Sequence, residues 1–490
     1  MPCSLKSLQC ASRGVAQSRQ AAHFTAGDAQ NDSVDRTRTT SDRKPVGSMS
    51  TRSVISPAST PDRSVDLAKH RHGEPTPGDI AVGVIIGRTS EYFDFFVYAI
   101  ASVMVFPKLV FPYVDALSGT LLSFAVFAVA FVARPLGTVI FIGVDRAYGR
   151  GVKLMIALLL LGVSTVAVAF LPGYDQIGSF SAMLLILFRL GQGLALGGEW
   201  DGLATLLALN TPEERRGWYA MIPQLGAPLG LIVASALFAF FVAKLPNADF
   251  LDWGWRYPFF VAFAINVVAL FARLRLVETP EFAQQFEALL LRPTSVPETL
   301  RAQGRNIVIG AFTPLASFAL FHTVTVFPLS WVLLNTNQSP ARFLIIEMVG
   351  AAVGVASIVA SGVLADRVGR RAMLGITAGM IAAFSGFAPQ LLSIGDVGEA
   401  IFMLFGFVLL GLSFGQSSGA VASSFPISYR YTGSALTTDF AWLFGAGFAP
   451  FVALILASHF GLMAAGAYLL SGAICTLVAL ALSPHRESPR

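Results

Sequence analysis

The chain has 490 residues, of which 54% are hydrophobic and only 13% are charged. Soluble domains average about 25% charged residues, so this composition excludes an ordinary soluble protein and indicates a polytopic membrane protein. The formal net charge is +5, but no basic helix or aromatic-basic array accompanies it, which argues against nucleic-acid binding. The three cysteines predict neither a disulfide framework nor a metal site.

Residues 1–76 are rich in Ser, Arg, Thr, Asp and Pro and hold no apolar run long enough for a signal peptide. We expect this segment to be a disordered cytoplasmic tail. Residues 1–27 are basic and free of acids, which resembles a transit peptide. The sequence after Met49 favours a different explanation, an over-extended start with Met49 as the true first residue.

Twelve mostly apolar segments follow, each long enough to cross a hydrocarbon layer of roughly 30 Å. Their apolar residues are continuous rather than alternating, which favours helices over a barrel. The segments cover approximately residues 81–106, 118–143, 152–172, 180–208, 217–243, 256–276, 306–334, 343–365, 372–393, 399–425, 434–458 and 462–482.

Lysine and arginine residues gather in alternate loops, which predicts that both termini are cytoplasmic. The longest internal polar segment separates six spans from six. We therefore expect an N-terminal half at 77–280, a cytoplasmic linker at 281–305, a C-terminal half at 306–484 and a short tail at 485–490.

The two halves repeat one another at a nearly constant offset. Asp145-Arg146 recurs as Asp366-Arg367, Gly193 and Gly197 recur as Gly415 and Gly419, and Pro228 recurs as Pro450. Coincident offsets argue for an internal duplication. The sequence thus predicts an all-α polytopic membrane protein with twelve transmembrane helices in two pseudo-symmetric six-helix halves.

The fourth apolar segment carries charges. At 100° per residue, Arg189, Gln192 and Glu199 share one arc of a helix, and Arg189 and Glu199 lie too far apart along the axis to pair directly. A charge near the middle of a bilayer costs about 2.5–3.5 kcal/mol on insertion scales, so such residues usually face a cavity and mark a transport pathway. A structural ion network is the alternative.

The first apolar segment carries a second polar stripe. Arg88, Glu91, Asp94 and Tyr98 project within about 120° of one another on a helix. We expect this stripe to lie near the middle of the membrane.

Several motifs resemble the major facilitator superfamily. GVLADRVGRR at 362–371 resembles its signature loop between the second and third helices of a half. The sequence further resembles the metabolite:proton symporter family, which includes permeases for oxoglutarate, citrate, shikimate and proline or betaine. That likeness rests on EYFDFFVY at 91–98, ARPLG at 133–137, RLGQGLALGGEWDG at 189–202, RRG at 215–217, QLGAPLG at 224–230, WGWRYPF at 253–259, ETPEF at 278–282 and RYTG at 430–433.

The resemblance implies the major facilitator fold, a central site between the halves and alternating access in a bacterial inner membrane. The sequence departs from the family at Asp145, which falls one residue early in the first signature loop. It also departs at Asp201, where glycine is usual, and at Asp439, where asparagine is common.

These observations give each candidate residue a role. The substrate-binding candidates are Arg189, Gln192, Tyr98, Gln224 and Arg88. The proton-coupling candidates are Asp94, Glu91, Glu199, His322 and Asp439. The cytoplasmic-gate candidates are Asp145, Arg146, Arg150, Asp366, Arg367, Arg370 and Arg371.

The resemblance and the helical spacing together suggest how transport is coupled. Without substrate, Arg189 pairs with Glu91 or Asp94; an anionic substrate then takes over Arg189, and the released carboxylate takes up a proton. Asp145 and Asp366 are expected to bind neighbouring helix ends and so hold the cytoplasmic side closed.

The predicted function is proton-coupled symport of a small organic acid by a monomer in contact with lipid, with no cofactor. The alternatives are a proton-coupled efflux antiporter, uptake of a betaine-like zwitterion, a transporter-like sensor and an intramembrane enzyme. The last rests on Gly411, Ser413 and Gly415, which fit G-x-S-x-G but lack the strand-turn-helix context.

Overall fold

The computed structural model describes residues 77–199, 207, 213–277, 292–418 and 425–483, all within one compact unit, His70–Arg490. The predicted tail at 1–76, Asp201, residues 281–291 of the linker predicted at 281–305 and the short tail at 485–490 lie outside these residues. The proposed limits of the two halves therefore stay predictions.

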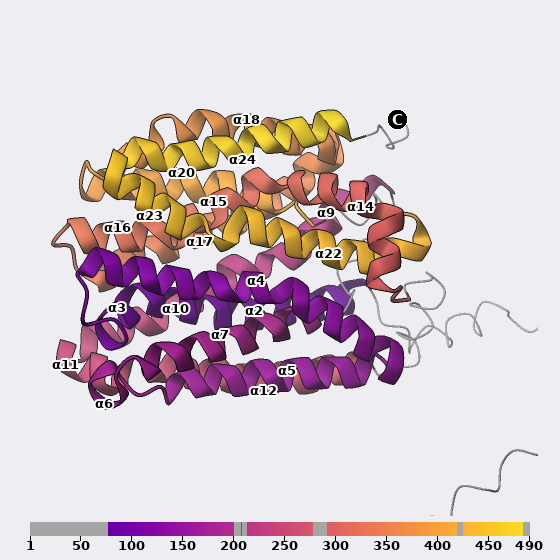
Figure 1. The fold of residues 1–490 in the computed structure, drawn as a ribbon. Helices are drawn as coiled ribbons and strands as arrows, with labels where there is room; N and C mark the ends of the chain where they lie inside the picture. The colour runs from indigo at the N-terminus through magenta and orange to yellow at the C-terminus, as the bar shows by residue number, and fades with distance from the viewer. Residues whose placement is uncertain (1–76, 200–206, 208–212, 278–291, 419–424, 484–490) are drawn as a thin grey trace, which may run out of the picture. The chain divides into compact units, whose positions relative to one another are not determined.

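The described residues before the linker form long helices joined by short turns (Figure 1). These are α2 (Pro77–Met104), α3 (Phe106–Leu109), α4 (Ala116–Tyr148), α5 (Arg150–Ala169), α6 (Tyr174–Ile177), α7 (Phe180–Gly198), η1 (Glu213–Arg215), α9 (Arg216–Met221), η2 (Ile222–Leu225), α10 (Gly226–Lys244), α11 (Asn247–Asp249), η3 (Phe250–Gly254) and α12 (Arg256–Val277).

The described residues from Arg292 onward repeat this pattern, and α14 begins at Val296, within the segment predicted as linker. They form α14 (Val296–Phe312), α15 (Leu315–Thr325), α16 (Phe327–Asn335), α17 (Pro340–Val368), α18 (Arg370–Ser385), α19 (Ala388–Leu391), α20 (Asp396–Phe414), η4 (Ile427–Tyr429), α22 (Arg430–Trp442), η5 (Leu443–Gly447), α23 (Ala449–Phe460) and α24 (Leu462–Leu482).

Each of the twelve predicted spans contains a helix, so the predicted fold class is confirmed. Ten helical stretches of the described residues are long and apolar enough to cross a membrane. The two spans outside this set are α2, which carries Arg88, Glu91 and Asp94, and α18, which has 16 residues.

Spans 5 and 11 each contain a change of helix geometry close to the repeated prolines Pro228 and Pro450. A 3₁₀ turn, η2, connects α9 to α10 just before Pro228, and a π-helical turn, η5, connects α22 to α23 just before Pro450. Proline cannot donate an intrahelical hydrogen bond, so each break falls where the regular ladder ends.

The helices α4 and α7 approach closely because glycines line their contact. A Cβ atom added at Gly193 would overlap the backbone at Ala130, and one added at Gly197 would overlap the backbone at Arg134 and Thr138. Small residues let helix backbones meet at this distance. This contact fixes the position of α7, which carries Arg189.

Helices that are distant in the sequence also pack together: α17 runs beside α9 and α10, and α22 contacts α4 (Figure 1). These contacts join the first six spans to the last six.

We predict that Gly197→Ala lowers the free energy of unfolding by about 1–3 kcal/mol, the usual cost of overpacking a tight contact. Gly143→Ala is the matched control, since nothing lies within 4 Å of an added Cβ there. It should be neutral or stabilising by up to about 1 kcal/mol, because alanine favours the helix. Thermal unfolding of both variants in detergent checks this; equal effects would contradict the packing argument.

Candidate functional site

Arg189 lies at the centre of the candidate site and is only 1% exposed. Its Nε donates to the carbonyl oxygen of Phe127 at 3.3 Å, and its Nη1 donates to Oε1 of Gln192 at 3.0 Å. The guanidinium carbon lies 4.0 Å from the ring centroid of Tyr98, a cation–π contact. Its Nη2 is buried and has no hydrogen-bond partner among the described residues. The cation is therefore incompletely satisfied.

A chain of hydrogen bonds connects Arg189 to Asp94. Nε2 of Gln192 donates to Oγ1 of Thr165 at 2.9 Å, and the Thr165 hydroxyl donates to Oδ1 of Asp94 at 2.7 Å. Within the described part of the chain, Arg189 forms no ion pair with Glu91 or Asp94, so the expected direct pair is wrong for this conformation. Gln192 and Thr165 occupy the space between the two charges. We call Arg189, Gln192, Thr165 and Asp94 the relay.

A second charged cluster joins three helices. Nη1 of Arg88 lies 2.7 Å from Oε2 of Glu91 on the same helix. Arg273 of α12 lies between two carboxylates, with Nη2 3.8 Å from Glu91 and Nη1 3.7 Å from Oε2 of Glu199. Both oxygens of Glu199 are buried without a hydrogen bond among the described residues. Glu199 thus has a partner on another helix, at long range.

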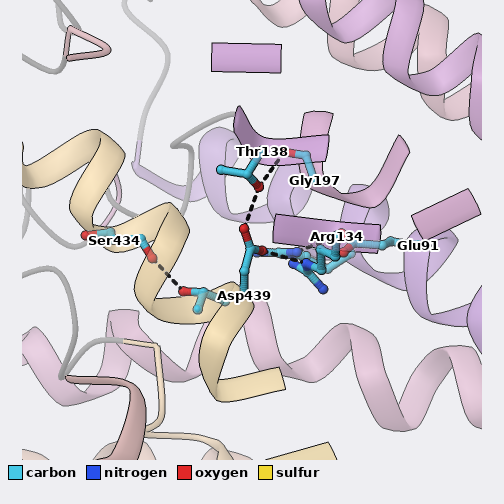
Figure 2. Close-up of polar contacts among 8 residues, drawn as sticks. Glu91, Arg134, Thr138, Gly197, Ser434 and Asp439 are labelled. Carbon is cyan, nitrogen blue, oxygen red and sulfur yellow. Dashed lines mark hydrogen bonds and ion pairs between the residues drawn. The ribbon is translucent and has the colours of Figure 1, made fainter. Parts of the chain in front are cut away.

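Asp439 is part of a buried contact between α4 and α22 (Figure 2). Its Oδ1 lies 2.8 Å from Nε of Arg134, and its Oδ2 lies 2.5 Å from the hydroxyl oxygen of Thr138. That hydroxyl oxygen is also 3.2 Å from the carbonyl oxygen of Gly197. We call Arg134, Thr138 and Asp439 the central latch, because they join the first six spans to the last six.

Two tight turns define one end of the bundle, which we call the signature-loop end. The α4–α5 turn passes through Gly149 at φ 85°, and the α17–α18 turn through Gly369 at φ 86°. Only glycine adopts this backbone readily. The carboxylate of Asp366, at the end of α17, accepts hydrogen bonds from the backbone amides of Gly217 and Trp218 at 2.6 and 3.2 Å. Asp366 thus binds a helix end, as expected.

The first signature loop uses a different arrangement. Oδ2 of Asp145 accepts a hydrogen bond from the Tyr431 hydroxyl at 3.1 Å and lies 3.2 Å from Nζ of Lys153. Nζ of Lys153 donates to the Tyr431 hydroxyl oxygen at 2.7 Å, and the Arg150 guanidinium lies 5.6 Å from the Tyr431 ring centroid. Asp145 therefore binds side chains instead of the expected helix end, because its shifted position directs it toward α5 and α22.

The other gate candidates lie at the same end. Arg371 donates to the carbonyl oxygens of Leu480 and Ser483 at the end of α24. It therefore holds together helices of one half. Arg146 and Arg367 are exposed, and Arg370 is the first residue of α18.

His322 is fully buried among aromatic rings near Arg189. Its ring stacks on Phe95 with centroids 5.1 Å apart and meets Phe127 edge-on at 5.4 Å. The same two rings lie 5.8 and 4.9 Å from the Arg189 guanidinium carbon. Nδ1 of His322 lies 3.4 Å from Oγ1 of Thr325. The last six spans thus supply a titratable group to the aromatic surroundings of Arg189.

The other two substrate-binding candidates, Tyr98 and Gln224, are also buried. Tyr98 is fully buried, and its hydroxyl has no hydrogen-bond partner in the described ranges. Gln224 is buried in η2.

Sequence reasoning missed six residues of these clusters: Arg273, Arg134, Thr138, Thr165, Lys153 and Tyr431. Arg273 lies near the end of α12, where an arginine equally suits a topology-setting role. Arg134 lies inside the ARPLG motif, and a cation in the middle of an apolar helix is a signal for function. Thr165 gave no signal, since a lone threonine is ordinary in an apolar helix. The described residues include no group of three or more His, Cys, Asp or Glu side chains that could hold a metal ion.

Buried charges at the centre of a twelve-helix bundle, with ionic contacts joining its two halves, define a membrane transporter. The comparisons with known proteins agree. A family described as "Sugar (and other) transporter" matches residues 80–289. The inner membrane metabolite transport protein YhjE of Escherichia coli (strain K12) is 38% identical over 413 residues, covering 82% of this chain and 93% of that protein. The chain belongs to the major facilitator superfamily of transporters, and it is not an enzyme.

Two further comparisons extend this result. The shikimate transporter of Escherichia coli (strain K12) is 31% identical over 419 residues, covering 84% of this chain and 94% of that protein. A crystal structure of a D-xylose-proton symporter superimposes with a TM-score of 0.63 at 18% identity, covering 82% of this chain and 96% of that chain. The structural likeness supports the fold alone.

We predict a strong coupling energy between Arg134 and Asp439. Each single change, Arg134→Gln or Asp439→Asn, leaves a buried polar group without its partner, whereas the double variant removes both. Coupling between such close pairs is about 1–3 kcal/mol. A double-mutant cycle on unfolding in detergent measures it.

The control cycle uses Arg342 and Asp396, which lie 2.6 Å apart but are 57% and 50% exposed. Exposed pairs contribute about 0–1 kcal/mol. Purely additive effects at the central latch would show that the halves are held together by other contacts.

Proposed function

We propose that the protein is a proton-coupled symporter that takes up a small carboxylated metabolite across a bacterial inner membrane. The observation that carries this proposal is the buried Arg189, whose Nη2 has no hydrogen-bond partner among the described residues. A desolvated guanidinium with a free donor favours a carboxylate ligand, which a planar guanidinium can bind through two hydrogen bonds. Relatives named as shikimate and proline/betaine transporters support this class, because all three compounds carry a carboxylate.

The relay suggests how the carboxylate and the proton are coupled. A substrate carboxylate on Arg189 replaces Gln192 as the acceptor and cancels the positive charge near Asp94. The carboxylate of Asp94 then lacks a compensating charge in an apolar environment, so it takes up a proton. Each ligand thereby strengthens the binding of the other. Glu91, Glu199 and His322 are the further candidates along the proton path.

The contacts at the signature-loop end suggest which side is closed. We assign this end, together with both termini, to the cytoplasm, because basic residues concentrate there. The central latch and the Asp366 contacts then close the cytoplasmic side in this conformation. Substrate release requires these contacts to break as the two halves rock. We propose that one chain performs this cycle as a monomer.

Uptake of a zwitterion is the second candidate. The aromatic rings of Phe95, Phe127 and Trp442 surround the region next to Arg189. Aromatic faces attract quaternary ammonium groups. A betaine would therefore place its carboxylate on Arg189 and its cation on these rings.

We predict that proteoliposomes accumulate a carboxylate when an inward proton gradient is applied, and that Arg189→Gln abolishes this uptake. The substrate panel contains shikimate, glycine betaine, proline and a cationic drug. Removing one partner of a buried charged hydrogen bond costs about 2–5 kcal/mol, which corresponds to a loss of at least tenfold.

The matched control is Arg342→Gln, which removes an exposed arginine and should leave uptake unchanged. Movement of the cationic drug alone, driven by proton exchange in the opposite direction, would contradict the proposal and favour an efflux antiporter. Carboxylate uptake that survives in Arg189→Gln would move the binding site away from the relay.

A further inference from the structure

Glu347 is a buried carboxyl group outside the clusters described above. It lies on α17 and is 0% exposed. Its Oε2 lies 3.1 Å from the Ser235 hydroxyl, which donates to it from α10. Its Oε1 is buried and has no hydrogen-bond partner among the described residues. One hydroxyl is a poor substitute for the hydration of a carboxylate, so this environment favours the neutral acid.

No described cation forms an ion pair with Glu347. Arg342, on the same helix, is paired with Asp396 at 2.6 Å. A small apolar cavity lined by Leu231, Gly354 and Phe407 lies about two turns along the helices from Glu347. Six elements of the described chain pack against α17, the helix that carries Glu347: α9, α10, α16, α18, α20 and η2. Their charged and titratable groups are Lys244 on α10, Asp396 and Glu399 on α20, Arg216 and Tyr219 on α9, and Arg370 and Arg371 on α18, whereas α16 and η2 have none. On α17 itself the other such groups are Arg342, Asp366 and Arg367.

The position of Glu347 connects it to the movement of the two halves. Gly217 of α9 meets Gly362 and Ala365 of α17, whereas Ser235 of α10 meets Glu347. The numbers rise along one helix as they fall along the other, so the helices are antiparallel. Glu347 therefore lies toward the end opposite the signature loops. Separation of α10 and α17 at that end would expose Glu347 to water.

We propose that Glu347 is a second proton-binding site, which holds a proton while α10 and α17 are together and releases it when they separate. Deprotonation leaves a charge that is stable only in water, so it favours the separated arrangement. The part that Glu347 plays in transport rests on the proposed proton coupling. The protonation of Glu347 does not rest on that coupling, and it is measured without substrate.

The first test is infrared spectroscopy of the purified full-length protein in nanodiscs. Protonated carboxyl groups give a C=O stretching band that carboxylates lack. We expect the wild type to show a buried carboxyl band that disappears in Glu347→Gln. Glutamine keeps the shape and can still accept the hydrogen bond from Ser235. Glu298→Gln is the control: Glu298 is exposed, and the Tyr429 hydroxyl lies 3.2 Å from its Oε1.

The second test measures the distance between spin labels at Ala243 on α10 and Ala341 on α17, in a background without the native cysteines. As the pH is raised, the wild type and Glu298→Gln should shift toward longer distances. Glu347→Gln is permanently neutral and should keep the short distance at every pH.

The proposal is overturned if the carboxyl band is the same in the wild type and Glu347→Gln, or if both respond to pH in the same way. If either of these outcomes is found while uptake still depends on the proton gradient and on Arg189, the proton site at Glu347 fails and the proposed symport stands. If uptake is independent of protons but Glu347→Gln loses the band and the pH response, the proposed symport fails and the proton site stands.

Discussion

The high cost of a charge inside apolar surroundings governs this structure. An isolated buried ion loses several kcal/mol of hydration free energy, so each buried charge needs a partner, a proton or a ligand. Arg134 and Lys153 meet this requirement with carboxylates, Asp439 and Asp145 respectively. Arg189 has amide, carbonyl and aromatic contacts, and no carboxylate of the described residues pairs with it. Arg134 and Lys153, which are paired, belong to contacts that hold the halves together. Arg189, whose Nη2 has no hydrogen-bond partner among the described residues, can still bind an anion.

The same constraint links conformation to ligands. The contacts of Asp366 and Asp145 at the signature-loop end, and that of Asp439 in the central latch, all join the first six spans to the last six. They persist only while the two halves stay together on that side. Toward the opposite end, Glu347 and Ser235 meet across the same division of the fold. A change in charge at these contacts or at Glu347 shifts the equilibrium between the conformation in which the halves meet there and the one in which they are apart, since each conformation stabilises a different set of ions.

Sequence reasoning predicted much of the fold. The twelve spans and the repeated halves follow from hydropathy and from coincident offsets, which can be read along the chain. The family follows from motifs. Asp366 was also correctly expected to bind a helix end, because the complete second signature loop fixes its position.

The partners of the buried charges were harder to predict. Helical spacing gives the face on which Arg189 lies, but it does not give the depth and rotation of α2 and α5 beside it. The expected pair with Glu91 or Asp94 was wrong for this reason: Gln192 and Thr165 lie in the gap. Arg273 was overlooked because its place near a span end equally suits a topology-setting residue, and only packing brings it between Glu91 and Glu199.

The most direct test of the central claim measures proton uptake when a transported carboxylate binds to the purified protein in weakly buffered solution. We expect proton uptake by the wild type. We expect little proton uptake by a Thr165→Val variant that still binds the carboxylate, because Asp94 without the Thr165 donor is then already neutral. Binding without proton uptake by the wild type, or equal uptake by both proteins, would contradict coupling through the relay.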